Sequence, residues 1–110
     1  MRGTLTVGAL FLISTLLVSG AEFSGHLMDT MCAAKKLDQA SSYTAQCMKD
    51  CARSGFGLVT KDGNYLKFNE SGNAKALKAL KAGNRQTNLQ VKVTGELQGS
   101  LIRVDSITMQ

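Results

Sequence analysis

Apolar and polar residues alternate along the second half of the chain, and this pattern predicts two long strands. In the segment 89–97, apolar residues occupy odd-numbered positions: Leu89, Val91, Val93 and Leu97. One apolar and one polar face are typical of a strand in an antiparallel sheet that covers a core. Gly95 interrupts this segment, which indicates a bend or a bulge there.

A second strand is expected over residues 101–109, after a turn at residues 98–100. Ile102 and Val104 share one face of this strand, but Ile107 is out of phase with them. One extra residue would restore the phase. The sequence therefore predicts a β-bulge near Asp105 and Ser106.

The first half of the chain shows shorter patterns. Residues 23–28 alternate and predict a strand, whereas residues 29–37 are expected to form a loop. A hairpin is predicted from residues 57–60 and 64–68. Its Asp62-Gly63 pair is typical of a tight primed turn, with Gly63 supplying a positive φ.

A helix is predicted over residues 42–53, because apolar residues recur there at three- and four-residue spacing. Ser42 or the serine before it is expected to cap the helix. Gly55 is expected to end it in the left-handed conformation. The spacing places Cys47 and Cys51 on the inward face, one turn apart.

A second, short helix is expected over residues 73–81, capped by Asn73 and ended by Gly83. Strands and helices in this order predict an α+β fold. We expect a small antiparallel OB-like β-barrel of about five strands, with a cysteine-bearing helix after the first strand.

The amino-terminal residues have the layout of a secretory signal peptide. Arg2 precedes an almost wholly apolar run from Leu5 to Val18, and small residues follow it. We expect residues 1–21 to be the signal peptide and residues 22–110 to be one domain, secreted or periplasmic and monomeric. An uncleaved anchor is the alternative, but a membrane span needs about 20 apolar residues. No membrane span is expected after cleavage.

Charge and motifs exclude several functions. Without Arg2 the net charge of +5 falls to about +4, and the basic residues are scattered. Nucleic-acid binding is therefore not expected. His26 is the only histidine, and the sequence has no serine-hydrolase elbow, zinc-protease helix or phosphate loop. No catalytic residue is assigned, and the chain is not expected to be an enzyme.

The three cysteines, Cys32, Cys47 and Cys51, are the main candidates for chemistry. Small exported domains often contain disulfides, and an odd number leaves at least one thiol outside any internal bond. A disulfide from Cys32 to Cys47 or Cys51 would connect the first loop to the helix. We expect Asp29 to order that loop by accepting backbone hydrogen bonds.

A soft-metal site is the alternative use of the same cysteines. Cys32, Cys47 and Cys51 would supply thiolates for copper or zinc. The residues His26, Met28 and Met31 lie close in sequence and are further candidate ligands. Thiol redox or sensing is a third possibility, although the chain has no Cys-x2-Cys motif. The disulfide interpretation requires no cofactor, and the sequence identifies no partner.

Three motifs give the chain a family resemblance. They are Gly-x-Leu-x-Asp-x-x-Cys at residues 25–32, Cys-x3-Cys-x3-Gly at 47–55, and a valine- and glycine-containing strand pattern at 91–104. With the leader, they resemble a group of small exported bacterial proteins of uncharacterised function. Some of those proteins carry a histidine between the first two cysteines, which this chain lacks. The resemblance implies an exported barrel-like domain and no established activity.

Taken together, these patterns predict an exported, non-enzymatic binding or structural domain of the cell envelope, stabilised by a disulfide. Gly55 and Gly63 have structural roles in this interpretation.

Overall fold

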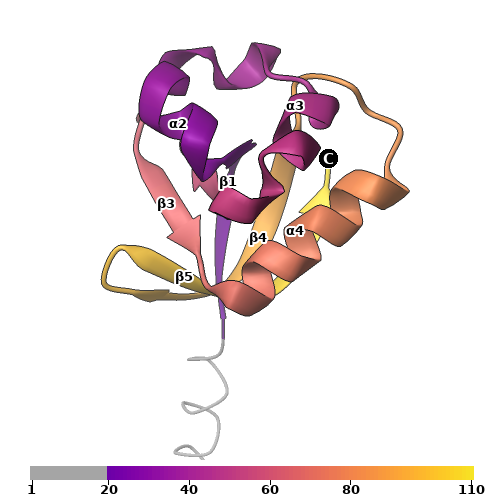
Figure 1. Ribbon diagram of the computed structural model, residues 1–110. Helices are drawn as coiled ribbons and strands as arrows, with labels where there is room; N and C mark the ends of the chain where they lie inside the picture. Colours follow the sequence, from indigo (N-terminus) through magenta and orange to yellow (C-terminus); the bar gives the residue numbers. More distant parts are fainter. Residues whose placement is uncertain (1–19) are drawn as a thin grey trace, which may run out of the picture.

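The computed structural model describes residues 20–110, which contain five strands, three α-helices and two short 3-10 helices (Figure 1). In chain order the elements are β1 (Ala21–Asp29), α2 (Thr30–Lys36), η1 (Leu37–Ser42), α3 (Ala45–Asp50), η2 (Ala52–Ser54), β2 (Phe56–Val59), β3 (Tyr65–Phe68), α4 (Glu70–Ala82), β4 (Gln90–Gln98) and β5 (Leu101–Met109). The predicted α+β class with five strands is confirmed for this part of the chain. The predicted signal peptide lies outside it, except for Gly20 and Ala21.

The five strands form one sheet that closes into a ring in the order β1-β2-β3-β5-β4. The ring closes because β1 pairs twice. Its residues 21–26 pair with β4, and its residues 26–29 pair with β2. Four of the five strand pairings are antiparallel, as expected for the predicted antiparallel barrel, and one is not. β3 and β5 run parallel, because α4 and β4 lie between them in the chain.

Gly25 lies where β1 passes from β4 to β2. A β-carbon at this position would overlap with the backbone carbonyl oxygen of Val59. Glycine therefore allows the two strands to approach closely at this point.

The predicted bulge is present in the β4–β5 hairpin. Thr94 pairs with Ser106 and Gly95 pairs with Val104, so Asp105 has no partner in the register. This extra residue corrects the phase of β5, as the sequence pattern required. Leu97 does not face the core as expected. Its side chain is 48% exposed, because the hairpin extends beyond the ring (Figure 1).

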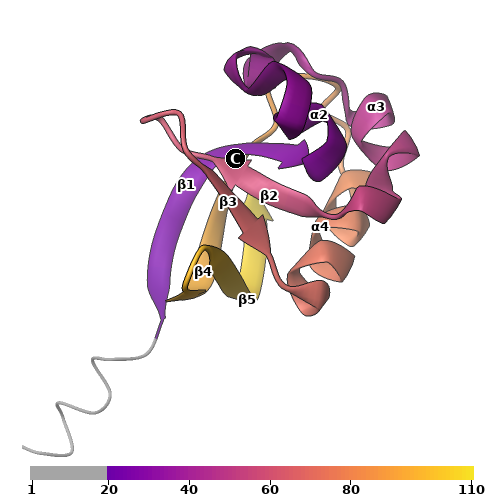
Figure 2. The same ribbon diagram turned by 60° about the vertical axis from the view of Figure 1, so that its left-hand side comes forward.

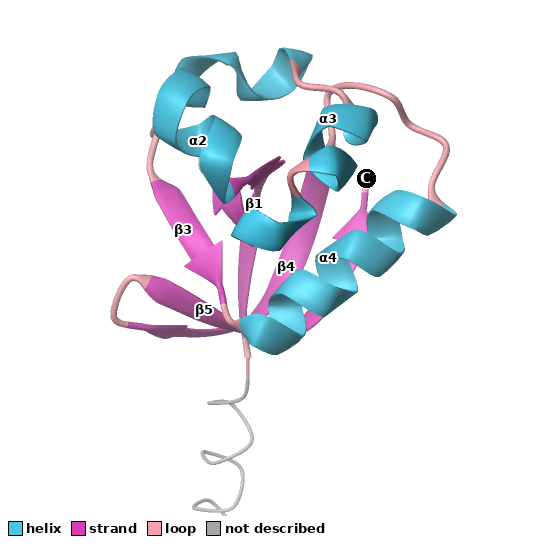
Figure 3. Cartoon of the chain, viewed as in Figure 1, coloured by secondary structure: helices cyan, strands magenta, loops and turns pink. Residues whose placement is uncertain are grey.

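The core fills the ring and the space beneath α4. Apolar side chains from all five strands and two helices form it. Its buried members are Leu27, Ala45, Met48, Phe56, Leu58, Phe68, Ala76, Leu80, Leu89, Val91, Val93, Ile102 and Val104. The helices gather on one side of the sheet (Figure 3), so they cover the core there.

The structure differs from the prediction at two helices: α2 was not predicted, and α3 begins later than predicted. The loop predicted for residues 29–37 is wrong, because α2 begins directly after Asp29. The cysteine-bearing helix begins at Ala45 rather than residue 42. Thr44 caps it, since its side chain accepts a hydrogen bond from the Cys47 N–H. The two serines that we expected to cap it lie in η1 instead.

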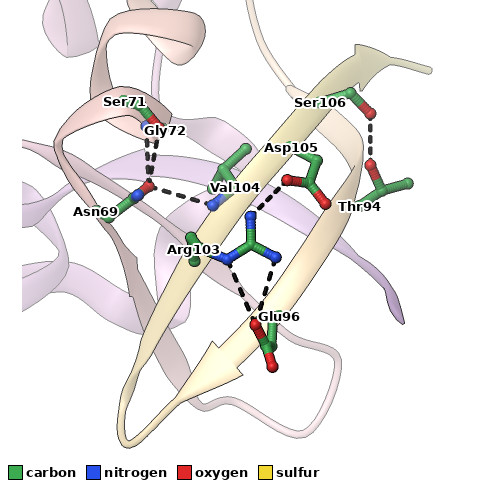
Figure 4. A network of polar contacts seen from close by, with 9 residues as sticks. All are labelled: Asn69, Ser71, Gly72, Thr94, Glu96, Arg103, Val104, Asp105 and Ser106. Atoms are coloured by element: carbon green, nitrogen blue, oxygen red, sulfur yellow. Dashed lines mark hydrogen bonds and ion pairs between the residues drawn. The ribbon is translucent and has the colours of Figure 1, made fainter. Parts of the chain in front are cut away.

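The second predicted helix is longer than expected. α4 begins at Glu70, and its cap is Asn69 rather than Asn73. Asn69 Oδ1 accepts hydrogen bonds from the Gly72 N–H at 3.0 Å and the Val104 N–H at 3.2 Å (Figure 4). This single amide oxygen therefore connects the start of α4 to β5. Asn73 Oδ1 instead accepts from the Phe56 N–H.

Two glycines have the expected positive φ. Gly63 has a φ of +86° in the turn between β2 and β3, where its N–H donates to the Thr60 carbonyl. The predicted tight primed turn is wrong, because Asp62 has no positive φ and the Thr60 N–H pairs with Asn64 across a longer loop. Gly55 has a φ of +88° and follows η2. Its ψ of 175° lies outside the left-handed helical region that we expected.

Candidate functional site

The cysteines lie in the segment Thr30–Ser54, which connects β1 to β2. Figure 2 shows α2 and α3 of this segment together at one end of the ring. A few backbone hydrogen bonds attach the segment to the rest of the molecule. The Thr30 N–H donates to Gly55, the Ala45 N–H donates to Gln86, and the Ser41 carbonyl accepts from Asn88.

Asp29, Cys32 and Cys51 form the one cluster of metal-ligating side chains in the described part of the chain. A carboxylate oxygen and the two sulfur atoms all lie within 4.8 Å of one another. The three residues come from different elements. Asp29 ends β1, Cys32 lies in the first turn of α2, and Cys51 follows the last residue of α3. We call these three residues the sulfur–carboxylate cluster.

Asp29 is fully buried, and its two oxygens have different environments. Oδ2 accepts a hydrogen bond of 2.9 Å from the Cys32 N–H and so caps α2. Oδ1 has no hydrogen-bond partner among the described residues, although it is buried. An unpartnered buried carboxylate oxygen is energetically unfavourable. The Cys32 thiol lies within hydrogen-bonding reach of this carboxylate, and Oδ1 is the oxygen whose acceptor capacity is left unsatisfied.

Cys32 has a strongly perturbed thiol. Burial and the neighbouring Asp29 carboxylate raise its pKa to about 12. Both effects disfavour the thiolate. In the metal-free chain the Cys32 thiol is therefore protonated at neutral pH, which makes it a poor nucleophile.

Met31 is the third sulfur-containing residue at this site. Its Sδ lies 4.0 Å from Cys51 Sγ, and its side chain is 51% exposed. Met31 therefore lies beside Cys51 with much of its surface exposed. Tyr43 packs on the Cys32 side, where it contacts the small apolar cluster beneath α2.

Cys47 lies outside the sulfur–carboxylate cluster and is exposed. The expectation that it faces inward with Cys51 is wrong. Ala45 and Met48 are the buried residues of α3, so Cys47 falls on the outer side of this short helix. The helix also ends at Asp50, and Cys51 has a φ of −102° and a ψ of 19°. The Cys51 N–H still donates to the Cys47 carbonyl, so the two residues lie one turn apart as assumed, but only Cys51 reaches the cluster.

The other candidate ligands lie elsewhere. Met28 is fully buried and packs with Ala33, Ala40 and Val59, so it belongs to the core. His26 Nε2 lies 2.7 Å from Asn88 Oδ1. His26 also lines an open cavity of about 420 Å³ together with Lys61, on a wall that contains none of the cysteines.

Sequence reasoning found both sulfurs but not the role of the carboxylate. It assigned Asp29 only to ordering the backbone. The signal was present in the Asp-x-x-Cys spacing, because a residue that caps a helix lies close to the residue three positions later. The burial of Asp29 depends on the tertiary structure, so it could not be read from the chain.

A scan of family models and searches of curated proteins and solved structures found no match to this chain. Among the described residues, no helix is long and apolar enough to cross a membrane.

Proposed function

We propose that this chain is an exported, non-enzymatic binding or structural domain of the cell envelope, stabilised by a disulfide between Cys32 and Cys51. The observation that carries the proposal is the approach of the two sulfur atoms to within 4.8 Å. A disulfide is about 2.05 Å long, so the two sulfurs would have to approach further, by side-chain rotation, for the bond to form.

The segment Thr30–Ser54 gives the disulfide a structural purpose. Its helices have seven and six residues, and few of their side chains are buried. Helices of this length are not stable alone. A Cys32–Cys51 bond would connect the start of α2 to the end of α3 and stabilise the fold by about 3 kcal/mol.

The leader and the resemblance support export, where disulfides form readily. Cleavage after Gly20 would leave β1 whole, because β1 begins at Ala21. The mature domain would then be secreted or periplasmic. The bacterial group that the chain resembles has the same expected organisation.

An OB-like barrel is the fold that we propose for the ring. The strand order β1-β2-β3-β5-β4, the double pairing of β1 and the helix between β3 and β4 support this assignment. Such barrels bind varied ligands on their surfaces, so the fold alone selects no ligand.

Thiol redox or sensing is less well supported. That chemistry requires a thiol with a lowered pKa, whereas the pKa of Cys32 is raised to about 12.

The test is the intact mass of the mature protein, collected from its own export pathway and treated with a thiol-alkylating reagent. We expect a mass lower by two hydrogen atoms than that of the reduced chain, and one alkylated site. A C47S variant should keep the mass loss and have no alkylated site. Three alkylated sites in the exported wild-type protein would contradict the proposal.

A further inference from the structure

We infer that the reduced domain binds one zinc ion between Cys32 Sγ, Cys51 Sγ and the carboxylate of Asp29. This inference rests on the proposed function in one respect: it uses the same two cysteines. The disulfide requires them oxidised, whereas the metal site requires them reduced.

The separations within the sulfur–carboxylate cluster suit a metal ion. Three atoms that lie within 4.8 Å of one another share a point no further than about 2.8 Å from each of them. Zinc lies about 2.3 Å from thiolate sulfur and about 2.0–2.2 Å from carboxylate oxygen. Small side-chain movements would therefore complete the coordination.

The buried carboxylate is the independent observation that indicates a cation. Asp29 Oδ1 is buried and lacks a hydrogen-bond partner among the described residues. A carboxylate oxygen of Asp29 lies within 4.8 Å of both sulfurs, so a cation bound there would compensate a buried carboxylate that is only partly hydrogen-bonded. Oδ2 would keep its hydrogen bond to the Cys32 N–H, and this contact would fix the orientation of the carboxylate toward the metal.

The donor types favour zinc over copper. Two thiolates with one carboxylate form a mixed soft and hard set, which zinc accepts readily. A site for Cu⁺ would be expected to use sulfur alone. Met31 Sδ lies near Cys51, but its side chain is half exposed. Water is the expected fourth zinc ligand.

This donor set differs from a site of three cysteines. Cys47 is exposed and outside the cluster, so it serves as the matched control. Asp29 contributes the third ligand instead. A D29N variant removes the negative charge but keeps an oxygen that can cap α2, since asparagine is as good a cap as aspartate.

The experiment uses the mature domain, reduced and kept free of oxygen. It is titrated with Co²⁺ as a spectroscopic probe, and Zn²⁺ then displaces the Co²⁺. We expect one equivalent of Co²⁺ with a thiolate-to-metal absorption band. The band should be lost in C32S and C51S and unchanged in C47S. D29N should weaken zinc binding about tenfold or more, with its thermal unfolding measured to confirm folding.

Four results would overturn the inference. They are the absence of the band in the reduced wild-type domain, a loss of affinity in C47S as large as in C51S, a folded D29N variant with unchanged affinity, and tight Cu⁺ binding with no zinc binding. The disulfide is tested separately by the mass of the exported protein, so either idea can fail without the other.

Discussion

The closed ring and the segment Thr30–Ser54 are stabilised in different ways. The ring has continuous strand pairing and contains most of the buried apolar side chains. The segment contributes little to that core. Beneath α2 there is only a small second cluster of Met28, Ala33, Ala40 and Val59. The hydrophobic effect therefore accounts for the ring better than for the segment.

The segment is held mainly by local contacts. Side-chain caps from Asp29 and Thr44 begin its two α-helices. A few backbone hydrogen bonds attach it to Gly55, Gln86 and Asn88. The sulfur–carboxylate cluster lies between its two ends. Ala45 and Met48 of α3 also pack in the main core, and the proposed Cys32–Cys51 disulfide would add to these contacts.

The largest effect should come from the core of the ring. Phe56 is 1% exposed and packs inside the main core. The change Phe56→Ala should lower the free energy of unfolding by about 3–5 kcal/mol, because it leaves a cavity. Urea denaturation measures this. Leu97→Ala is the control and should change little, since Leu97 is exposed. Equal losses in the two variants would contradict the assignment of the core.

The next effect should separate the two regions. In the exported protein, Cys51→Ser removes the proposed disulfide and should cost about 3 kcal/mol. The rate of backbone amide hydrogen exchange should rise most in residues 30–54 and least in β4 and β5. Cys47→Ser should leave exchange unchanged. Uniform loss of protection across the ring would show that the segment is not a separate weak region.

A smaller effect is expected where α4 meets the ring. Asn69→Ala removes the acceptor for the Gly72 and Val104 N–H groups (Figure 4) and should cost about 1–2 kcal/mol. Asn69→Asp keeps an acceptor oxygen, so it should retain most of the stability. Thermal unfolding of the two variants tests this. An Asn69→Ala variant as stable as the wild type would contradict the role of this contact.

The smallest effect is confined to high pH. Burial raises the pKa of Tyr65 to about 12 from its ordinary value of 10.0. Its hydroxyl donates to the Met28 carbonyl. A raised pKa in the folded state stabilises the fold fully below pH 10, and this contribution is lost as the pH rises from about 10 to about 12.

Comparison with Tyr65→Phe isolates that contribution. The stability difference between wild type and variant should shrink over this pH range, measured on the oxidised protein so that Cys32 does not titrate. A difference that stays constant with pH would contradict the buried environment of Tyr65.

The sequence predicted the ring better than the segment, for a physical reason. Strand alternation shows which residues face the core, so β4, β5 and the bulge at Asp105 were predicted correctly, apart from the exposed Leu97. α2 was missed because Ala33 is its only buried residue, which leaves no apolar stripe. The parallel β3–β5 pair depends on topology, which alternation does not encode.

The candidate site was predicted in part. Cys32 and Cys51 come together, but Cys47 does not, because Ala45 and Met48 form the buried face of α3 and Cys47 lies on its exposed face. Asp29 lies beside the sulfurs because it is the buried last residue of β1. Burial of a single polar residue arises from packing between distant segments, so no local pattern reports it.

The central claim is that Cys32 and Cys51 form one pair and that Cys47 lies outside it. The most direct test is a peptide map of the exported protein, digested without reduction after free thiols are alkylated. The account predicts a linked peptide that joins Cys32 to Cys51, with the alkyl group on Cys47. A bond from Cys32 to Cys47, with the alkyl group on Cys51, would contradict it.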